Sequence, residues 1–148
     1  MIVSRKSRYA MRAVFELAKR NGMGPIKISD IADKQAIPPR FLEVILCQLK
    51  QGGYVDSVRG KDGGYMLKMP PDTISVGSVL RFFQGLQEPV DCLGDNPKEK
   101  CPLSVNCVFM PLWEDMSKAI SGVCDSVSFQ TLVEKERENC GSACEYVI

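Results

Sequence analysis

The chain has 148 residues, seven cysteines, no histidine and a formal net charge of +1. This length suits one domain, or one domain with an appendage, and is sufficient for a substantial core. The lack of histidine removes the commonest general base and the commonest metal ligand. No apolar run approaches a membrane span and no signal peptide is visible, so we expect a cytoplasmic protein that does not enter a membrane.

The near-balanced charge hides an asymmetry between the two parts of the chain. Residues 1–68 contain 13 Lys and Arg against six Asp and Glu, a net of +7, whereas residues 69–148 have a net of −6. Random placement would also give such a difference, but the excess coincides with the helix–hairpin unit described below. The asymmetry therefore indicates a polyanion that contacts the N-terminal part.

The first predicted helix opens at Ser4 or Ser7 and runs to about Arg20. Its apolar residues form one continuous stripe. Four cations cluster at its start, namely Arg5, Lys6, Arg8 and Arg12. A solvated face and a phosphate-contacting face explain this cluster equally well.

Residues 28–51 predict two further helices joined by a tight turn. Ser29 is expected to cap the first, and Pro39 suits the first position of the second. The second helix places apolar residues at helical spacing and polar ones on another face. The apolar set is Leu42, Ile45, Leu46 and Leu49, and the other face has Arg40, Glu43, Cys47 and Lys50.

Residues 54–58 and 65–67 predict two strands joined by a basic, glycine-rich tip, residues 59–64. A helix pair followed at once by such a hairpin is typical of a winged helix-turn-helix, in which the second helix enters the major groove of DNA. The fold class is therefore mostly α with a small β-hairpin wing. The predicted DNA-binding residues are Ser29, Pro39, Arg40, Glu43, Val44, Arg59, Lys61, Arg5 and Arg8.

The remaining chain predicts a helix capped by Ser75, an exposed loop and a long helix from about Pro111 to Cys124 with a wide apolar stripe. That stripe can pack on its own domain or on a second subunit. We favour the second subunit because groove-reading proteins usually act as symmetric dimers. The expected units are a DNA-binding domain, a cysteine loop, a dimerisation helix with its following segment, and a tail that could be disordered: 1–84, 85–110, 111–133 and 134–148.

Three cysteines in this loop region, Cys92, Cys101 and Cys107, follow the spacing C-x8-C-x5-C. Soft thiolates on a polar loop suit an iron–sulfur cluster or zinc, and unpaired solvent-side thiols are the alternative. Cys47 and Cys124 lie within predicted helices and are expected to be packing residues. A redox pair, a reserve of ligands and no role at all remain open for Cys140 and Cys144.

The sequence resembles the winged-helix transcription regulators that include the iron–sulfur cluster regulator IscR, the nitric-oxide-sensitive repressor NsrR and the cysteine-metabolism repressor CymR. The resemblance covers residues 1 to about 133. The motifs that carry it are Ser7-Arg8-Tyr9-Ala10, Phe41-Leu42-Glu43, the wing from Val58 to Tyr65, the cysteine loop with Leu112-Trp113, and the stretch from Val127 to Leu132.

The resemblance implies a homodimer crossed through its long helices on a palindromic operator of double-stranded DNA. It implies that Arg40 and Glu43 face bases in the major groove and that Arg59 enters the minor groove, roles that suit these side chains. It also implies a two-iron, sometimes four-iron, cluster on the three loop cysteines.

Two positions depart from the pattern of this family. Met110 stands where some members have a histidine ligand, and Arg8 stands where others have an acidic ligand from the partner subunit. The fourth cluster ligand is thus open: Cys124, a tail cysteine, a carboxylate or a small molecule. An incomplete protein shell predicts a labile cluster, accessible to O₂ or nitric oxide.

The leading hypothesis is a dimeric DNA-binding repressor or activator whose operator affinity is set by the cluster. Loss of the cluster would relax residues 92–110 and change the spacing of the two reading helices. The main alternative is the same regulator acting as a metal-free thiol sensor. A small electron carrier or redox enzyme, and a module that binds only protein, explain less, and no nucleophile–base pair indicates an enzyme.

Overall fold

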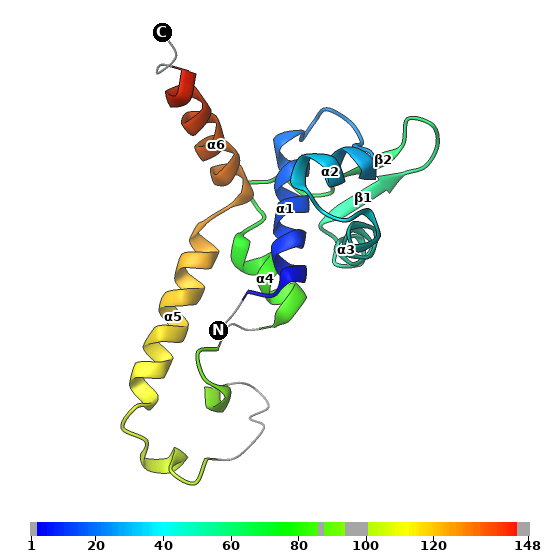
Figure 1. The fold of residues 1–148 in the computed structure, drawn as a ribbon. Coiled ribbons are helices and arrows are strands. Elements are labelled where there is room, and N and C mark those ends of the chain that lie inside the picture. Colours follow the sequence, from blue (N-terminus) through cyan, green and yellow to red (C-terminus); the bar gives the residue numbers. More distant parts are fainter. Residues whose placement is uncertain (1–2, 86–87, 94–100, 145–148) are drawn as a thin grey trace.

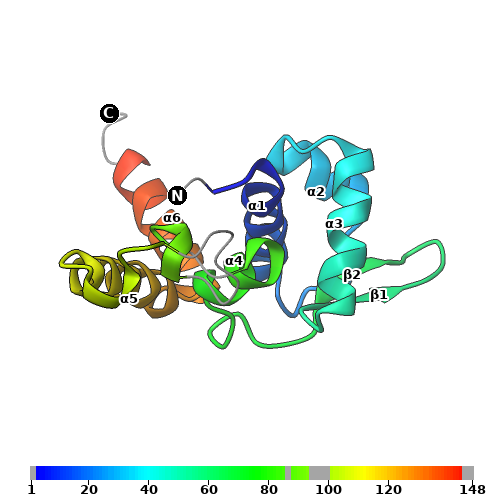
Figure 2. The same ribbon diagram turned by 90° about the horizontal axis from the view of Figure 1, so that it is seen from below.

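The protein is described here by a computed structural model that covers residues 3–85, 88–93 and 101–144. Figure 1 shows a helical body from which a two-stranded wing projects on one side, while a long helix, α5 (Met110–Ser126), lies on the other. The view in Figure 2 places the wing and α5 at opposite ends as well. Within these residues, no helix is both long enough and apolar enough to cross a membrane.

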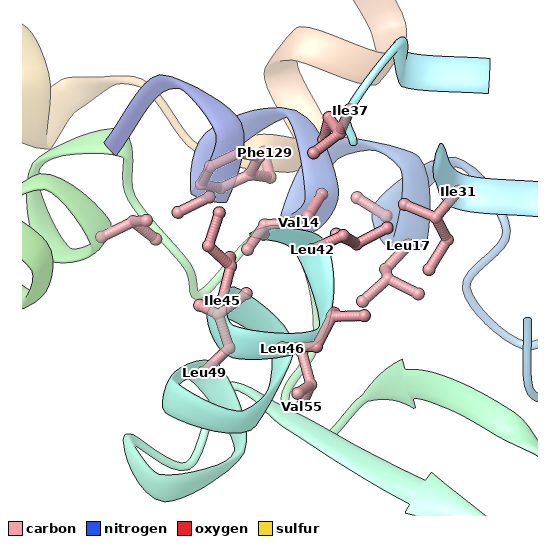
Figure 3. Close-up of a cluster of buried hydrophobic side chains, with 14 of the residues drawn as sticks. Val14, Leu17, Ile31, Ile37, Leu42, Ile45, Leu46, Leu49, Val55 and Phe129 are labelled. Atoms are coloured by element: carbon pink, nitrogen blue, oxygen red, sulfur yellow. The ribbon is translucent and has the colours of Figure 1, made fainter. Parts of the chain in front are cut away.

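Helix α1 (Arg5–Lys19) lies at the centre of the body and packs against four other helices. It begins where the sequence predicts, because the Ser4 side chain accepts a hydrogen bond of 3.0 Å from the Ser7 backbone N–H. Its buried residues Val14 and Leu17 meet apolar side chains from the helix pair and from the C-terminal helix (Figure 3). α1 therefore joins the DNA-binding part to the rest of the chain.

Helices α2 (Ile28–Gln35) and α3 (Pro39–Gln51) form the predicted pair. The expected capping by Ser29 is wrong: Lys27 occupies the cap position, no side chain caps α2, and Ser29 lies exposed in its first turn. The helix begins two residues earlier than a cap at Ser29 implies, at Ile28, which is half-buried against the core. Pro39 does begin α3, where its missing N–H costs nothing.

The wing consists of β1 (Val55–Val58) and β2 (Gly64–Leu67), paired antiparallel with Val55 opposite Leu67 and Val58 opposite Gly64. Its base is anchored by a bridge in which Ile26 and Tyr65 exchange two backbone hydrogen bonds of 2.8 Å. A Cβ atom on Gly64 would collide with the Ile26 backbone, so only glycine permits this close approach. The bridge fixes where the wing leaves the body.

Helix α4 (Val76–Gln84) begins at the predicted cap, where the Ser75 side chain accepts a hydrogen bond of 3.0 Å from the Ser78 N–H. Two short 3₁₀ turns, η1 (Asp91–Leu93) and η2 (Ser104–Asn106), follow before α5. The predicted loop of residues 85–100 lies partly outside the described residues. α5 packs against α4, where Arg81 forms a two-point ion pair with Asp125.

Helix α6 (Phe129–Cys144) differs from the expected tail. Phe129 and Val133 are buried in the core against α1, and the helix continues through the charged stretch after residue 133. The expected boundary at residue 134 thus falls within a helix that continues to Cys144. Lys19 of α1 reaches Glu136 at 3.3 Å, a contact that sequence reasoning could not supply. Residues 145–148 lie outside the described part.

Candidate DNA-binding surface and cysteine segment

The exposed face of α3 is the first component of the candidate site. Leu42, Ile45, Leu46 and Leu49 are buried in the core, so the helix turns its remaining positions outward. Arg40, Glu43 and Val44 are all exposed, as are Pro39 and Lys50. A helix that presents a cation, a carboxylate and an apolar side chain together can make contacts with base edges in a major groove.

Arg5 and Arg8 are exposed on the first turn of α1. The start of α1 is held in place by Gln84, whose side-chain oxygen accepts a hydrogen bond of 3.0 Å from the Ser4 N–H. Exposed cations at a fixed helix end suit contact with phosphates. Arg5 lies beside α3, where it lines a groove with Phe41 and Val44. Arg8 instead lines a different hollow, with Phe129 and Leu132 of α6.

Arg59 and Lys61 lie exposed at the turn between β1 and β2. Lys50 of α3 donates a hydrogen bond to the Ser57 hydroxyl of β1, which links the end of α3 to the wing. Ser29, in contrast, is exposed on α2 without the capping role that the sequence predicts. The wing thus places two further cations at one side of α3.

A groove of about 410 Å³ between α1 and α3 was not anticipated as part of the site. Its lining comes from both helices and combines two cations with mostly apolar residues: Arg5, Lys6, Tyr9, Phe41, Val44 and Ile45. Phe41 is 60% exposed. Its position off the apolar stripe of α3 is the signal that could have identified it.

The three loop cysteines lie on the segment that connects α4 to α5. Cys92 in η1 and Cys107 after η2 are half-buried, and Cys101 is exposed; all three are free thiols. Among the described residues, no three Cys, Asp or Glu side chains gather closely enough to hold a metal ion. The structure therefore supplies the thiols on one connected segment without bringing them together.

The packing role predicted for two other cysteines, Cys47 and Cys124, fits the structure for Cys124 only. Cys47 is exposed on α3, so its expected packing role is wrong, because the buried stripe of that helix passes on the opposite side. Cys124 is half-buried and faces Gly77 and Leu80 of α4, which fits a packing residue. Cys140 is exposed on α6.

An apolar surface on α5 and on the segment before it remains uncovered. Leu112 and Val123 are 51% and 67% exposed, and the residues before α5 add Leu103, Val105, Val108 and Phe109. So many exposed large apolar side chains on one part of the chain indicate a site of interaction.

A paired helix unit with a polar, exposed second helix, flanked by a cationic helix end and a basic wing, defines a winged helix-turn-helix DNA-binding protein. The sequence agrees with this class. The chain belongs to the Rrf2 family of iron-dependent transcriptional regulators, whose sequence model matches residues 3–135.

Individual relatives make the similarity more specific. The HTH-type transcriptional regulator IscR of Aliivibrio salmonicida is 36% identical over 133 residues, which cover 90% of this chain and 77% of that protein. The solved structure of T. potens IscR has a TM-score of 0.76 and 31% identity, covering 94% of this chain and 90% of that one.

A solved structure of CymR, the global cysteine regulator of B. subtilis, is nearly as similar. Its TM-score is 0.74 at 30% identity, covering 91% of this chain and 98% of that chain. The protein is thus a transcriptional regulator of the IscR type, in a family of regulators and not of enzymes.

Proposed function

We propose that two copies of this regulator bind a palindromic operator and that an iron–sulfur cluster held by Cys92, Cys101 and Cys107 sets their affinity for it. The observation that carries the DNA-binding part is the exposed face of α3, which has Arg5 and Lys6 of α1 and the basic wing beside it. Arg40 and Glu43 read bases in the major groove. Arg59 enters the minor groove, and Lys61, Arg5 and Arg8 contact phosphates.

The uncovered apolar side of α5 supports the dimer. A helix of 17 residues with no buried residue in the single chain needs a partner for its apolar face. A second copy of α5 supplies a matching surface, and a twofold arrangement gives two α3 helices for two half-sites. The operator would then be palindromic because it reflects this symmetry.

The residues present fit the chemistry of an iron–sulfur cluster. Three free thiols lie between α4 and α5, and thiolates are the ligands that such clusters require. A bound cluster would supply a redox-sensitive cross-link. Ligation by Cys92, Cys101 and Cys107 would fix the segment before α5 at three points. We assign α5 itself to the dimer contact. Cys124, a tail cysteine, a carboxylate or a small molecule would supply the fourth ligand.

The specific alternative is a thiol sensor that needs no metal. It is favoured by the similarity to CymR and by the free, accessible state of Cys101. In this case the same segment responds to oxidation of its thiols. Both alternatives keep the DNA-binding surface unchanged.

Anaerobic purification followed by iron and acid-labile sulfide assays separates the two. The proposal predicts brown protein with iron and sulfide that are lost in a triple Cys92→Ala, Cys101→Ala, Cys107→Ala variant, and a dimer by analytical ultracentrifugation. Colourless wild-type protein that binds DNA in a thiol-dependent manner supports the alternative. A monomer with no affinity for any duplex contradicts the DNA-binding part as well.

Operator selection with holo and apo protein then provides a duplex on which the residue roles are tested. Arg40→Ala should weaken operator binding and relax the base preference, with a cost of about 1–3 kcal/mol. Lys61→Ala should weaken binding to all sequences about equally and reduce the salt dependence. Equal losses of both variants on specific and random duplexes would contradict this division of roles.

A further inference from the structure

We infer that Phe41 and Val44 recognise the C5-methyl groups of thymines in the operator, so that the protein selects particular T·A pairs by apolar contact. The inference rests on the proposed entry of α3 into the major groove. It adds an apolar form of base recognition to the polar one assigned to Arg40 and Glu43.

The exposure of these two side chains is the first step. Phe41 and Val44 are 60% and 55% exposed, although both lie on a helix whose other large aliphatic residues are fully buried. They are three positions apart, so they lie on the same side of α3, one turn from each other. An aromatic ring and a branched aliphatic side chain thus form a small apolar strip beside the polar residues.

The surroundings of the strip indicate what covers it. Phe41 and Val44 line the groove together with Arg5 and Lys6, so apolar surface adjoins cationic side chains. A DNA duplex has the complementary arrangement: phosphates, which suit the cations, lie on the outside, and thymine methyl groups, which suit the apolar strip, project into the major groove. The N-terminal part of the chain, net +7, favours this polyanion over an apolar protein partner.

The strip is also separate from the apolar surface that we assign to the dimer. The α5 helix lies on the opposite side of the body from α3 and the wing (Figures 1 and 2). Pairing through α5 therefore leaves Phe41 and Val44 open.

Chemistry restricts what these side chains can read. Neither has a donor or acceptor, so they cannot distinguish the hydrogen-bonding edges of bases. In the major groove, the thymine methyl is the apolar group that a base pair of unmodified DNA presents. Phe41 and Val44 therefore contribute to specificity only at positions where a thymine lies against α3.

The test replaces single thymines with deoxyuracil, which removes the methyl group and keeps every hydrogen-bonding atom. The probe is the duplex that the protein itself selects from random sequences under anaerobic conditions. At one or two positions in each half-site, the change should raise the Kd of the wild type by about two- to fivefold, the scale of burying one methyl group. Phe41→Ala and Val44→Ala should each remove this sensitivity at one position.

Met23→Ala is the matched control, since Met23 is a large exposed apolar residue outside α3. In this variant, the ratio of the Kd for the uracil duplex to the Kd for the thymine duplex should equal the wild-type ratio at every position. Circular dichroism verifies that both α3 variants fold. Arg40-dependent selection of a duplex without any response to uracil would overturn the inference and leave the proposed function intact. Failure to select any duplex would instead remove the proposed function on which it rests.

Discussion

The side-chain amide of Gln35 at the end of α2 donates a hydrogen bond of 2.8 Å to the carboxylate of Glu16 near the C-terminal end of α1. Glu16 is only 2% exposed. Lys19 and Arg20 approach the same carboxylate at 3.1 and 3.3 Å, and Lys19 also reaches Glu136 of α6. One buried carboxylate therefore connects α2, the helix before α3, through Lys19 to the C-terminal helix α6.

Glu16→Gln should destabilise the protein by about 1–2 kcal/mol at neutral pH, because it removes the charge that satisfies several donors. Burial by itself raises the pKa of Glu16, but the hydrogen bonds from Gln35 and Lys19 and the charges of Lys19 and Arg20 outweigh it and hold that pKa below 4.5. A lowered pKa gives stability that is present above pH 4.5 and is lost as the pH falls through the folded value. The difference in the free energy of unfolding between the wild type and Glu16→Gln should therefore become smaller in acid. Urea unfolding at a series of pH values from 7 downward measures this difference.

Glu114→Gln is the control, since Glu114 is exposed on α5. This substitution should leave the midpoint of urea unfolding, and the dependence of that midpoint on pH, nearly unchanged. A Glu16→Gln protein that is as stable as the wild type at neutral pH would contradict the role assigned to this carboxylate.

The helix pair and the wing could be predicted because their signals are local. Pro39 at the start of α3 and Ser75 at the cap of α4 are determined by backbone groups a few residues away, and both predictions are confirmed. The cap at Ser29 failed because packing of Ile28 competes with the local signal. The hydrogen bond between Glu16 and Gln35 could not be predicted, because the two residues are 19 positions apart and no periodic pattern marks a contact between helices.

The candidate site also has one part that local sequence signals predict and one part that they do not. The exposed face of α3 follows from its buried stripe, so Arg40 and Glu43 could be placed from periodicity alone. The spacing of Cys92, Cys101 and Cys107 does not determine the path of the chain between them. The metal site therefore stays a prediction.

Gly77→Ala should disturb the joint between α4 and α5, with a loss of about 1–2 kcal/mol. A Cβ atom at this position would collide with the Asp125 side chain and displace it from Arg81. Gly122→Ala on α5 is the matched control, because an added Cβ there meets no atom within 4 Å. It should raise stability by up to about 1 kcal/mol through helix propensity. Thermal unfolding of both variants gives the comparison, and equal effects would show that the joint is not tightly packed.

Cys47 provides a direct test of whether α3 enters the groove. Its thiol is exposed on the helix that carries Arg40 and Glu43, and Cys140 is exposed on α6 at a distant place in the fold (Figure 1). In free protein, iodoacetamide should modify both. Operator DNA should protect Cys47, because a helix seated in the major groove has its exposed face covered, and should leave Cys140 reactive. Peptide mass spectrometry after a short pulse measures both rates in one sample. Unchanged modification of Cys47 at saturating operator would place the DNA on another surface.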